Sequence, residues 1–131
     1  MAEPVLRVAV PSPVRRLFDY LPPAGEDPAW MAPGMRVRVP FGRRRVVGII
    51  AALADTSDLP AAKLRRAEAV LDGRPLLTAD TLALLHRAAD YYHHPPGEVF
   101  AAALPVRLRD GHPARPGGPP RRRRRGPRRA R

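Results

Sequence analysis

The sequence predicts an α+β fold, with a small antiparallel β-sheet or half-barrel in the N-terminal half packed against a mainly helical C-terminal half. Short runs of alternating apolar residues occur in residues 1–75. In residues 76–110, apolar residues at helical spacing are followed by a proline pair. Eighteen prolines and ten glycines among 131 residues predict short elements and many turns. This length suits one modest domain, which we place at residues 1–110.

Period-two alternation, together with two further short β-type runs, predicts the strands of the first half. In the first run Leu6, Val8 and Val10 share one side, and a second short run ends at Pro22-Pro23. The expected strands cover residues 5–10, 17–21, 35–39 and 46–53.

The last two of these runs predict a hairpin with a basic tip. The third run sends apolar and basic side chains to opposite sides: Met35, Val37 and Val39 against Arg36 and Arg38. A turn containing Gly42 then leads through three consecutive arginines into the fourth run.

The second half is expected to be mainly helical. Thr78 is a good N-cap, and Asp80 lies near the positive end of the helix dipole. Four residues at helical spacing share a face of a helix over residues 79–92: Leu82, Leu85, Ala89 and Tyr92. A short helix over 97–104 should follow, whereas residues 64–71 are compatible with either helix or strand.

The net charge of +12 is unevenly distributed. Residues 1–110 hold fifteen basic and twelve acidic residues, whereas residues 111–131 hold nine arginines and no acid, so +9 lies in the last 21 residues. Apolar residues nearly vanish there, so we expect 111–131 to be a disordered Arg/Pro/Gly-rich tail. Most of the charge therefore says little about the folded part.

Composition also limits the kind of protein. Cysteine is absent, which excludes disulfides, thiolate metal sites and cysteine nucleophiles. No apolar run approaches the ~20 residues that span a bilayer, and the N-terminus lacks the pattern of a signal peptide. We expect a cytoplasmic protein that makes no membrane contact.

The sequence does not predict an enzyme. It contains no phosphate-binding loop, dinucleotide-binding fingerprint or nucleophile elbow. His93 and His94 are adjacent at an expected helix end and point in different directions, which disfavours a metal site. We interpret them as a helix C-terminus at which imidazoles contact free carbonyls or the negative dipole end.

Two features suggest nucleic acid, and the first is a cluster of basic residues on the hairpin. Its members are Arg36, Arg38, Arg43, Arg44 and Arg45. Five guanidiniums without an intervening acid are candidates for phosphate contacts, although many such runs form only a solvated face.

The second feature is Phe18-Asp19-Tyr20. One interpretation is two core aromatics and a solvated carboxylate, because alternation puts Asp19 on the opposite face from the two rings. The other is a nucleotide-end pocket, since a carboxylate accepts a hydrogen bond from a hydroxyl and repels phosphate. Aromatic rings could hold a sugar or base there without reading sequence.

An ordered set of motifs carries a resemblance to a known family. Two stretches are the most specific, Arg38-Val39-Pro40-Phe41-Gly42 and Tyr91-Tyr92-His93-His94-Pro95. Others occur in the same order at residues 8–11, 18–21, 47–50 and 71–72, so the resemblance covers roughly residues 5–110. The chain resembles the N-terminal 3′-DNA-binding domain of primosomal protein N′ (PriA), the bacterial replication-restart helicase.

The resemblance implies a binding site and a role. Asp19 would accept the terminal 3′-OH of a nascent strand at a stalled fork, with Phe18 and Tyr20 shaping the pocket. Gly42 would let the backbone approach the nucleotide, and Arg65 stands where the family commonly has a lysine. The expected partners are forked DNA with a free 3′-OH, and candidates also include primosome proteins and single-strand-binding protein.

The resemblance also implies what these residues lack. The zinc and ATP of the family belong to domains not found in this sequence, so we expect no cofactor and no metal. We also expect a monomer. Two alternatives stay open: a general polyanion-binding protein acting through its Arg-rich tail, and a protein-interaction module of the primosome.

Overall fold

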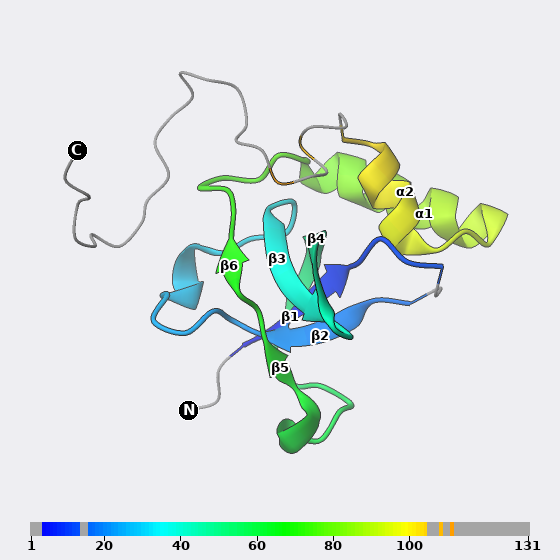
Figure 1. Ribbon diagram of the computed structural model, residues 1–131. Coiled ribbons are helices and arrows are strands. Elements are labelled where there is room, and N and C mark those ends of the chain that lie inside the picture. Colours follow the sequence, from blue (N-terminus) through cyan, green and yellow to red (C-terminus); the bar gives the residue numbers. More distant parts are fainter. Residues whose placement is uncertain (1–3, 14–15, 105–107, 109–110, 112–131) are drawn as a thin grey trace.

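The computed structural model describes residues 4–13, 16–104, 108 and 111 and shows a curled sheet with two helices at one end (Figure 1). The four longer strands are β1 (Val5–Ala9), β2 (Phe18–Leu21), β3 (Arg36–Phe41) and β4 (Arg44–Ala54). Two-residue strands follow, β5 (Arg65–Arg66) and β6 (Ala69–Val70), then the helices α1 (Ala79–Tyr92) and α2 (Pro96–Ala102). Single 3₁₀ turns lie at Pro28–Trp30 and Ala61–Lys63.

The strand order is β5-β2-β1-β4-β3-β6, and one pairing differs from expectation. All neighbours run antiparallel except β2 and β5, which are parallel, so the sheet is mixed and the expected purely antiparallel sheet is corrected. Parallel neighbours need a crossover connection, and residues 22–64 supply a long one that contains the β3–β4 hairpin.

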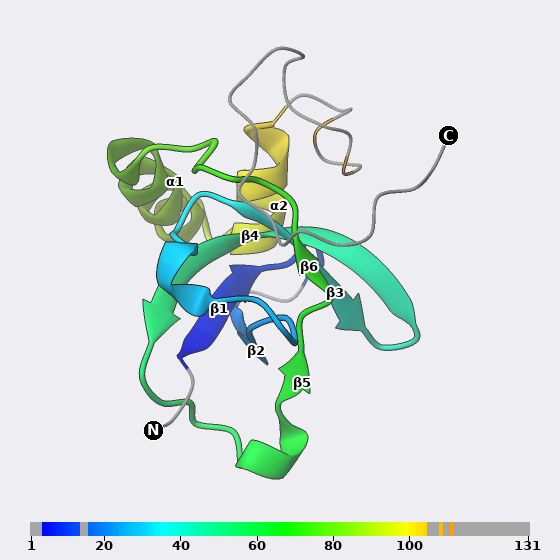
Figure 2. The same ribbon diagram turned by 90° about the vertical axis from the view of Figure 1, so that its left-hand side faces the viewer.

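One short segment joins the two edges of this sheet. β5 pairs with β2 at one edge, and β6, only two residues further along the chain, pairs with β3 at the other. Ala67 N–H donates to Leu21 C=O and Glu68 N–H to Arg38 C=O, both at 2.8 Å. These bonds curl the sheet into the expected half-barrel and show that residues 64–71 are extended (Figure 2).

The predicted hairpin is confirmed, with a two-residue turn. Phe41 pairs with Arg44, which leaves Gly42 and Arg43 as the loop. Gly42 has φ 65°, a value that a two-residue turn of type II′ requires at its first position and that glycine adopts without steric cost. Arg43, Arg44 and Arg45 are exposed, so the tip is basic.

Two apolar clusters lie on opposite faces of the central strands. Val8 and Ile50 belong to the cluster inside the curled sheet, which also contains the three alternating apolar residues of β3 and its approach. Ala9 and Ile49 belong to the other cluster, where Leu82 and Phe100 of the helices pack on the sheet. Alternation thus gave the correct faces, but both faces of β1 and β4 are covered.

The helices end where local signals place their limits. Thr78 Oγ1 accepts a hydrogen bond from Thr81 N–H and caps α1, and Leu82 and Ala89 are its buried residues. His93 takes a left-handed conformation (φ 57°) and ends the helix, with backbone N–H groups of His93 and His94 donating to carbonyls of the last turn. Backbone amides thus donate to these carbonyls, and the contacts expected of the two imidazoles stay a prediction. The second helix spans Pro96–Ala102 rather than 97–104.

Gly97 sets the distance between α2 and the sheet. A Cβ built there would lie 1.6 Å from the carbonyl oxygen of Val10, a contact that no side chain tolerates. The start of α2 therefore rests directly on the end of β1, beside the β1–β2 connection.

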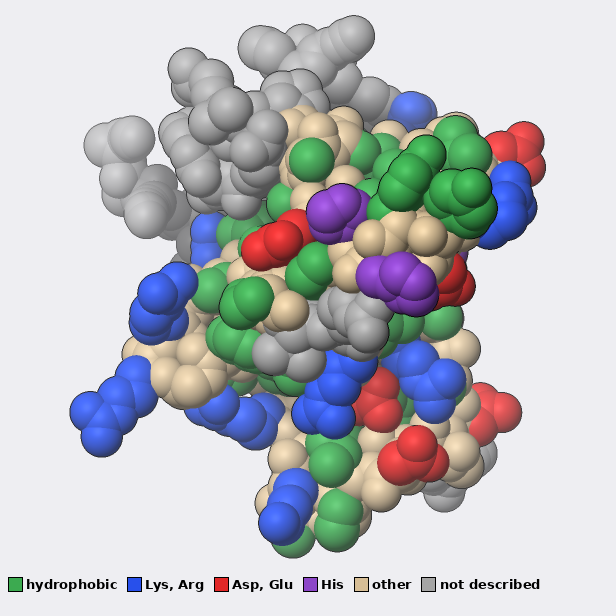
Figure 3. Space-filling model, turned by 90° about the vertical axis from the view of Figure 1, so that its right-hand side faces the viewer, with side chains coloured by type: hydrophobic (Ala, Val, Ile, Leu, Met, Phe, Trp, Pro, Cys, Tyr) green, Lys and Arg blue, Asp and Glu red, His purple; other side chains and the backbone are tan. Residues whose placement is uncertain are grey.

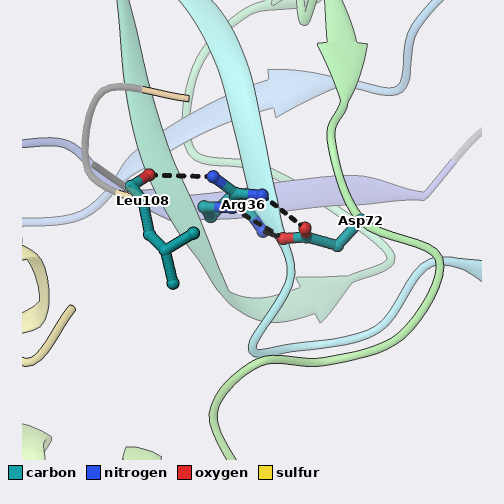
Figure 4. Close-up of polar contacts among 3 residues, drawn as sticks. All are labelled: Arg36, Asp72 and Leu108. Carbon is teal, nitrogen blue, oxygen red and sulfur yellow. Dashed lines mark hydrogen bonds and ion pairs between the residues drawn. The ribbon is translucent and has the colours of Figure 1, made fainter. Parts of the chain in front are cut away.

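Arg36 has a structural role, which corrects its assignment as a phosphate contact. Its side chain is 1% exposed, and its Nη2 and Nε donate to the two carboxylate oxygens of Asp72 at 2.7 and 3.0 Å (Figure 4). Nη1 also donates to Leu108 C=O at 2.9 Å. The side of β3 that carries Arg36 is covered by the chain near Asp72 and Leu108. The guanidinium is therefore not accessible to a DNA strand at the surface.

No helix among the residues that the structure describes is long and apolar enough to cross a bilayer. The expected disordered tail lies outside the described residues, apart from Gly111.

Candidate nucleic-acid interface

A cavity of about 310 Å³ lies at the edge of β2, between the hairpin turn and the β4–β5 connection. Its walls include all five residues predicted for a 3′-end pocket, namely Phe18, Asp19, Tyr20, Gly42 and Arg65. The fold therefore brings together residues that are up to 47 positions apart in the sequence.

The open edge of β2 explains why residues of both strand faces reach one cavity. Tyr20 and Leu21 pair with β5, whereas Phe18 and Asp19 pair with β1 alone among the described strands. A space at an uncovered edge can be lined from both faces. Alternation did place Asp19 opposite the rings, but it said nothing about where the neighbouring strand would end.

Asp19 is held on both carboxylate oxygens. Arg7, directly opposite on β1, places Nε 3.4 Å from Oδ1, and Ser57 Oγ donates to Oδ2 at 2.5 Å. Leu59 N–H donates in turn to Ser57 Oγ at 3.1 Å. The Asp19 side chain is 15% exposed, and a carboxylate has about four acceptor sites, so it can still accept from a further donor.

Aromatic rings form one wall of the cavity. Phe18 and Phe41 meet edge to face with centroids 5.1 Å apart, and the guanidinium of Arg16 lies 5.0 Å from the centre of the Phe18 ring. Tyr20 is 5% exposed and donates its hydroxyl to Pro40 C=O at 2.7 Å. This bond fastens β2 to the hairpin next to the turn.

Burial raises the pKa of Tyr20 above its ordinary value of 10.0, and the nearby Arg65 guanidinium opposes part of that rise. Tyr20 therefore keeps its proton at neutral pH and remains the donor in the bond to Pro40.

Gly42 and Arg65 form the far wall. Arg65 Nη1 donates to Gly42 C=O at 3.3 Å, which ties β5 to the hairpin turn. A Cβ at Gly42 would meet no described atom within 4 Å, so the described part of the chain leaves the space beside this residue open. The positive φ of the turn is thus sufficient to explain the glycine, and room for a ligand is an additional feature.

The remaining predicted phosphate contacts differ in their surroundings. Arg43 and Arg44 are exposed at the hairpin tip, beside the cavity-lining residues Phe41 and Gly42, and Arg38 is half-buried. Arg45 forms an ion pair with Glu68, and both side chains are well exposed. The tip therefore presents cations next to the cavity.

Sequence reasoning missed several residues that line the cavity or hold Asp19 from behind it. Arg7 and Ser57 hold Asp19, Arg16 covers Phe18, and Lys63 lies in the wall with Asp58 and Leu59. Arg7 could have been found as the basic residue of an otherwise apolar strand. The loop residues carry no local signal, because the long β4–β5 connection alone brings them to β2.

No cluster of three or more histidine, cysteine or acidic side chains suitable for a metal occurs in the described part of the chain.

Comparison with known proteins places this architecture in a family. Residues 7–105 match the family model described as the 3′ DNA-binding domain of PriA. The chain is 44% identical over 110 residues to the replication restart protein PriA of Haemophilus influenzae, a match that covers 84% of this chain and 15% of the Haemophilus protein. The corresponding protein of Buchnera aphidicola from Acyrthosiphon pisum is 30% identical over 103 residues, 77% of this chain and 14% of that protein. That of Bacillus subtilis is 37% identical over 71 residues, covering 54% of this chain and 9% of that protein. The chain thus spans about one-seventh of the length of the first two relatives.

Proposed function

The chain belongs to the family of PriA 3′ DNA-binding domains, and we propose that it binds the free 3′-OH end of a nascent strand at a stalled replication fork. In this role it would be the non-catalytic recognition module of a replication-restart protein that assembles the primosome. The observation that supports the proposal best is the Asp19 carboxylate at a cavity with an aromatic wall and cations around it.

The Asp19 carboxylate would discriminate between a 3′-OH end and a 3′-phosphate end. A terminal hydroxyl can donate to Asp19, whereas a 3′-phosphate would bring negative charge against it. Asp58 lies in the same wall and would add to that repulsion. A strand that continues past the site has no hydroxyl to donate.

The aromatic wall supplies affinity without sequence preference. Phe18 is half-buried and faces the cavity beside Phe41, so the two rings offer an apolar surface to a sugar or a base. Tyr20 is fastened to the backbone of Pro40 and contributes a fixed shape rather than a free hydroxyl.

The cations attract the rest of the strand. Arg16, Lys63 and Arg65 are exposed around the cavity, and Arg43 and Arg44 extend from the hairpin tip. Such contacts strengthen binding to any nucleic acid and weaken as salt rises. Arg36 is omitted from this set because it is buried.

The test compares one oligonucleotide ending in a 3′-OH with the same oligonucleotide ending in a 3′-phosphate. Binding to the whole chain is measured by fluorescence anisotropy at several salt concentrations. We expect tighter binding of the 3′-OH form, and we expect Asp19→Asn to abolish the difference. Equal affinity of the wild-type chain for both ends would overturn the proposal.

A second candidate function is general polyanion binding by the tail, which carries +9 of the net charge of +12. Replacing the nine arginines of residues 111–131 by glutamine tests it in a chain of unchanged length. If nearly all DNA affinity disappears at moderate salt, the tail is the functional part. If the 3′-OH preference survives, the folded part recognises the end.

DNA is the partner that the family relationship supports. Contacts with primosome proteins or single-strand-binding protein, a monomeric state, the absence of a cofactor and a cytoplasmic, nucleoid-associated location all remain proposals. Pull-down of fork DNA beside pull-down of candidate protein partners separates end recognition from a protein-interaction role.

A further inference from the structure

We propose that a second cavity, at the C-terminal end of α1, binds the nucleotides that precede the terminal one. This inference rests on the proposed 3′-end function and extends it from one nucleotide to a short single-stranded path. The cavity measures about 390 Å³ and lies between α1, the start of α2 and the β1–β2 connection.

The two cavities adjoin each other. Arg16 and Leu17 line both of them, so the second cavity begins where the wall of the first ends. A strand whose 3′ terminus lies beside Asp19 must leave the first cavity in some direction. Passage by Arg16 sets its next phosphate against a guanidinium that already lies over the Phe18 ring.

The side chains of the second cavity suit a nucleotide. His86, His93 and His94 line it together with Asp90, and Ala89 and Pro96 add apolar surface. Imidazole can donate to or accept from a base, and a carboxylate accepts from the exocyclic amino groups of bases. The volume falls in the range of roughly 300–1,000 Å³ that small-ligand sites occupy.

Exposed aromatic rings lie at the same end of α1 as the cavity. Tyr91 and Tyr92 are 76% and 63% exposed, and their rings meet edge to face 4.8 Å apart. Tyr92 also lies 6.4 Å from the ring of His94, which lines the cavity. Figure 3 shows histidine side chains with exposed hydrophobic side chains on one side of them and Lys/Arg side chains on the other.

Such exposure is unusual for a ring that serves only the fold. Neither tyrosine belongs to the apolar clusters of the described residues, so burial does not explain them. Flat rings beside a cavity with a cation at its entrance form a stacking platform of the kind that proteins use for single strands. Because every base has a π-face, the platform would be tolerant of sequence, as a fork sensor must be.

The platform is held by the fold before any ligand arrives. Gly97 permits the close contact of α2 with Val10, and the left-handed conformation of His93 turns the chain sharply at the end of α1. The tyrosines lie on α1, which packs on α2, and α2 in turn rests on the end of β1. A pre-formed surface loses little conformational entropy on binding.

The experiment measures affinity as a function of oligonucleotide length. A chain whose nine tail arginines are replaced by glutamine is used, so that tail electrostatics do not add their own length dependence. Anisotropy titrations compare 3′-OH oligonucleotides of two and six nucleotides. We expect the longer one to bind about tenfold or more tightly, because stacking of additional bases contributes at this scale.

The decisive variant is Tyr92→Ala with His94→Ala, both exposed positions whose loss should leave the fold intact. We expect this variant to lose most of the length-dependent gain while keeping the preference of the dinucleotide's 3′-OH form over its 3′-phosphate form. Tyr92→Phe retains a stacking ring and should keep the gain. Leu84→Ala, an equally exposed apolar residue of α1 that lines neither cavity, is the matched control. Circular dichroism and thermal melting establish that each variant is folded.

The outcome separates this inference from the one it rests on. A length-dependent gain that is unchanged in the double variant, or no gain in the parent chain, overturns the second cavity as a nucleotide site. The 3′-OH preference of the dinucleotide is read from the same titrations against its 3′-phosphate form. Its loss would remove the end-recognition function, whatever the length dependence shows.

Discussion

Two arginine–aspartate pairs connect separate segments of this fold, and they differ in burial and in geometry. Arg36 and Asp72 are 1% and 5% exposed and joined by short, bidentate contacts, with Leu108 C=O accepting a further bond. Arg7 and Asp19 are 40% and 15% exposed, and their closest approach is 3.4 Å. Asp19 lines a cavity, whereas Asp72 is buried.

The difference lies in what surrounds each pair. Asp72 is fully enclosed, so its charge must be neutralised by the same chain. Asp19 stands at an open strand edge, where water screens it and a ligand can approach. Identical residue types therefore hold the sheet to the helical half in one place and present an acceptor in the other.

The largest effect should come from breaking the buried pair. Arg36→Ala or Asp72→Asn leaves a charged or polar group buried without its partner, which typically costs about 3–5 kcal/mol. Urea denaturation should show that loss in the free energy of unfolding. The exposed pair of Arg45 and Glu68 is the reference, where Arg45→Ala should cost roughly 0–1 kcal/mol. Equal costs for the two pairs would mean that burial does not distinguish them.

The next effect concerns ligand binding. Asp19→Asn removes the charge but keeps the shape of the side chain, so the free energy of unfolding should change little. The preference for a 3′-OH over a 3′-phosphate should fall by about tenfold or more, the scale of a hydrogen bond to a charged group. Anisotropy titrations with both oligonucleotides measure it. A large loss of stability with unchanged preference would make this pair a second structural pair.

A smaller effect is expected from Ser57. Its hydroxyl donates to the same Asp19 carboxylate that the 3′-OH is proposed to contact. Removing this competing donor in Ser57→Ala should raise affinity for a 3′-OH end about two- to fivefold, within the range of one neutral hydrogen bond. The 3′-phosphate form serves as the control ligand. Weaker binding of the 3′-OH end would instead show that Ser57 orients the carboxylate.

The smallest expected effect is the pH dependence of stability that comes from Tyr20, the neighbour of Asp19 on β2. Tyr20 neighbours Asp19 but faces the core, and burial raises its pKa. A raised pKa in the folded state favours the protonated form, so its contribution to stability is complete below the unfolded pKa near 10 and is lost as pH rises through the folded pKa. The free energy of unfolding should therefore decline above about pH 10 in the wild type.

The matched variant is Tyr20→Phe. It removes the titrating group and the bond to Pro40, so it should be slightly less stable at neutral pH. Its decline above pH 10 should be shallower than that of the wild type. Parallel declines in urea titrations at several pH values would show that other groups control the alkaline limit.

Local patterns were sufficient for several elements. The N-cap at Thr78 and the helical spacing that follows it predicted α1 over its whole length, and alternation predicted the buried faces of β1 and β3. A glycine before a run of arginines predicted the hairpin and its basic tip. These features depend on residues within a few positions of one another.

Local sequence patterns gave no answer or a wrong one where contacts with distant segments determine the structure. Residues 64–71 could not be assigned, because each of their two short strands is stabilised by an edge of the sheet formed much earlier in the chain. Arg36 was misassigned for the same reason, since its partner Asp72 is 36 positions away.

The sequence by itself thus determined the α+β class, the main elements and, through ordered motifs, the family. The tertiary structure alone decided which arginine is buried, and that Asp19 shares a cavity with the rings from the other face of its strand. It also brought Ser57, 38 positions away, to that carboxylate. Periodicity and capping act through neighbouring residues, whereas burial and pocket shape arise from contacts between segments that meet only when the sheet closes.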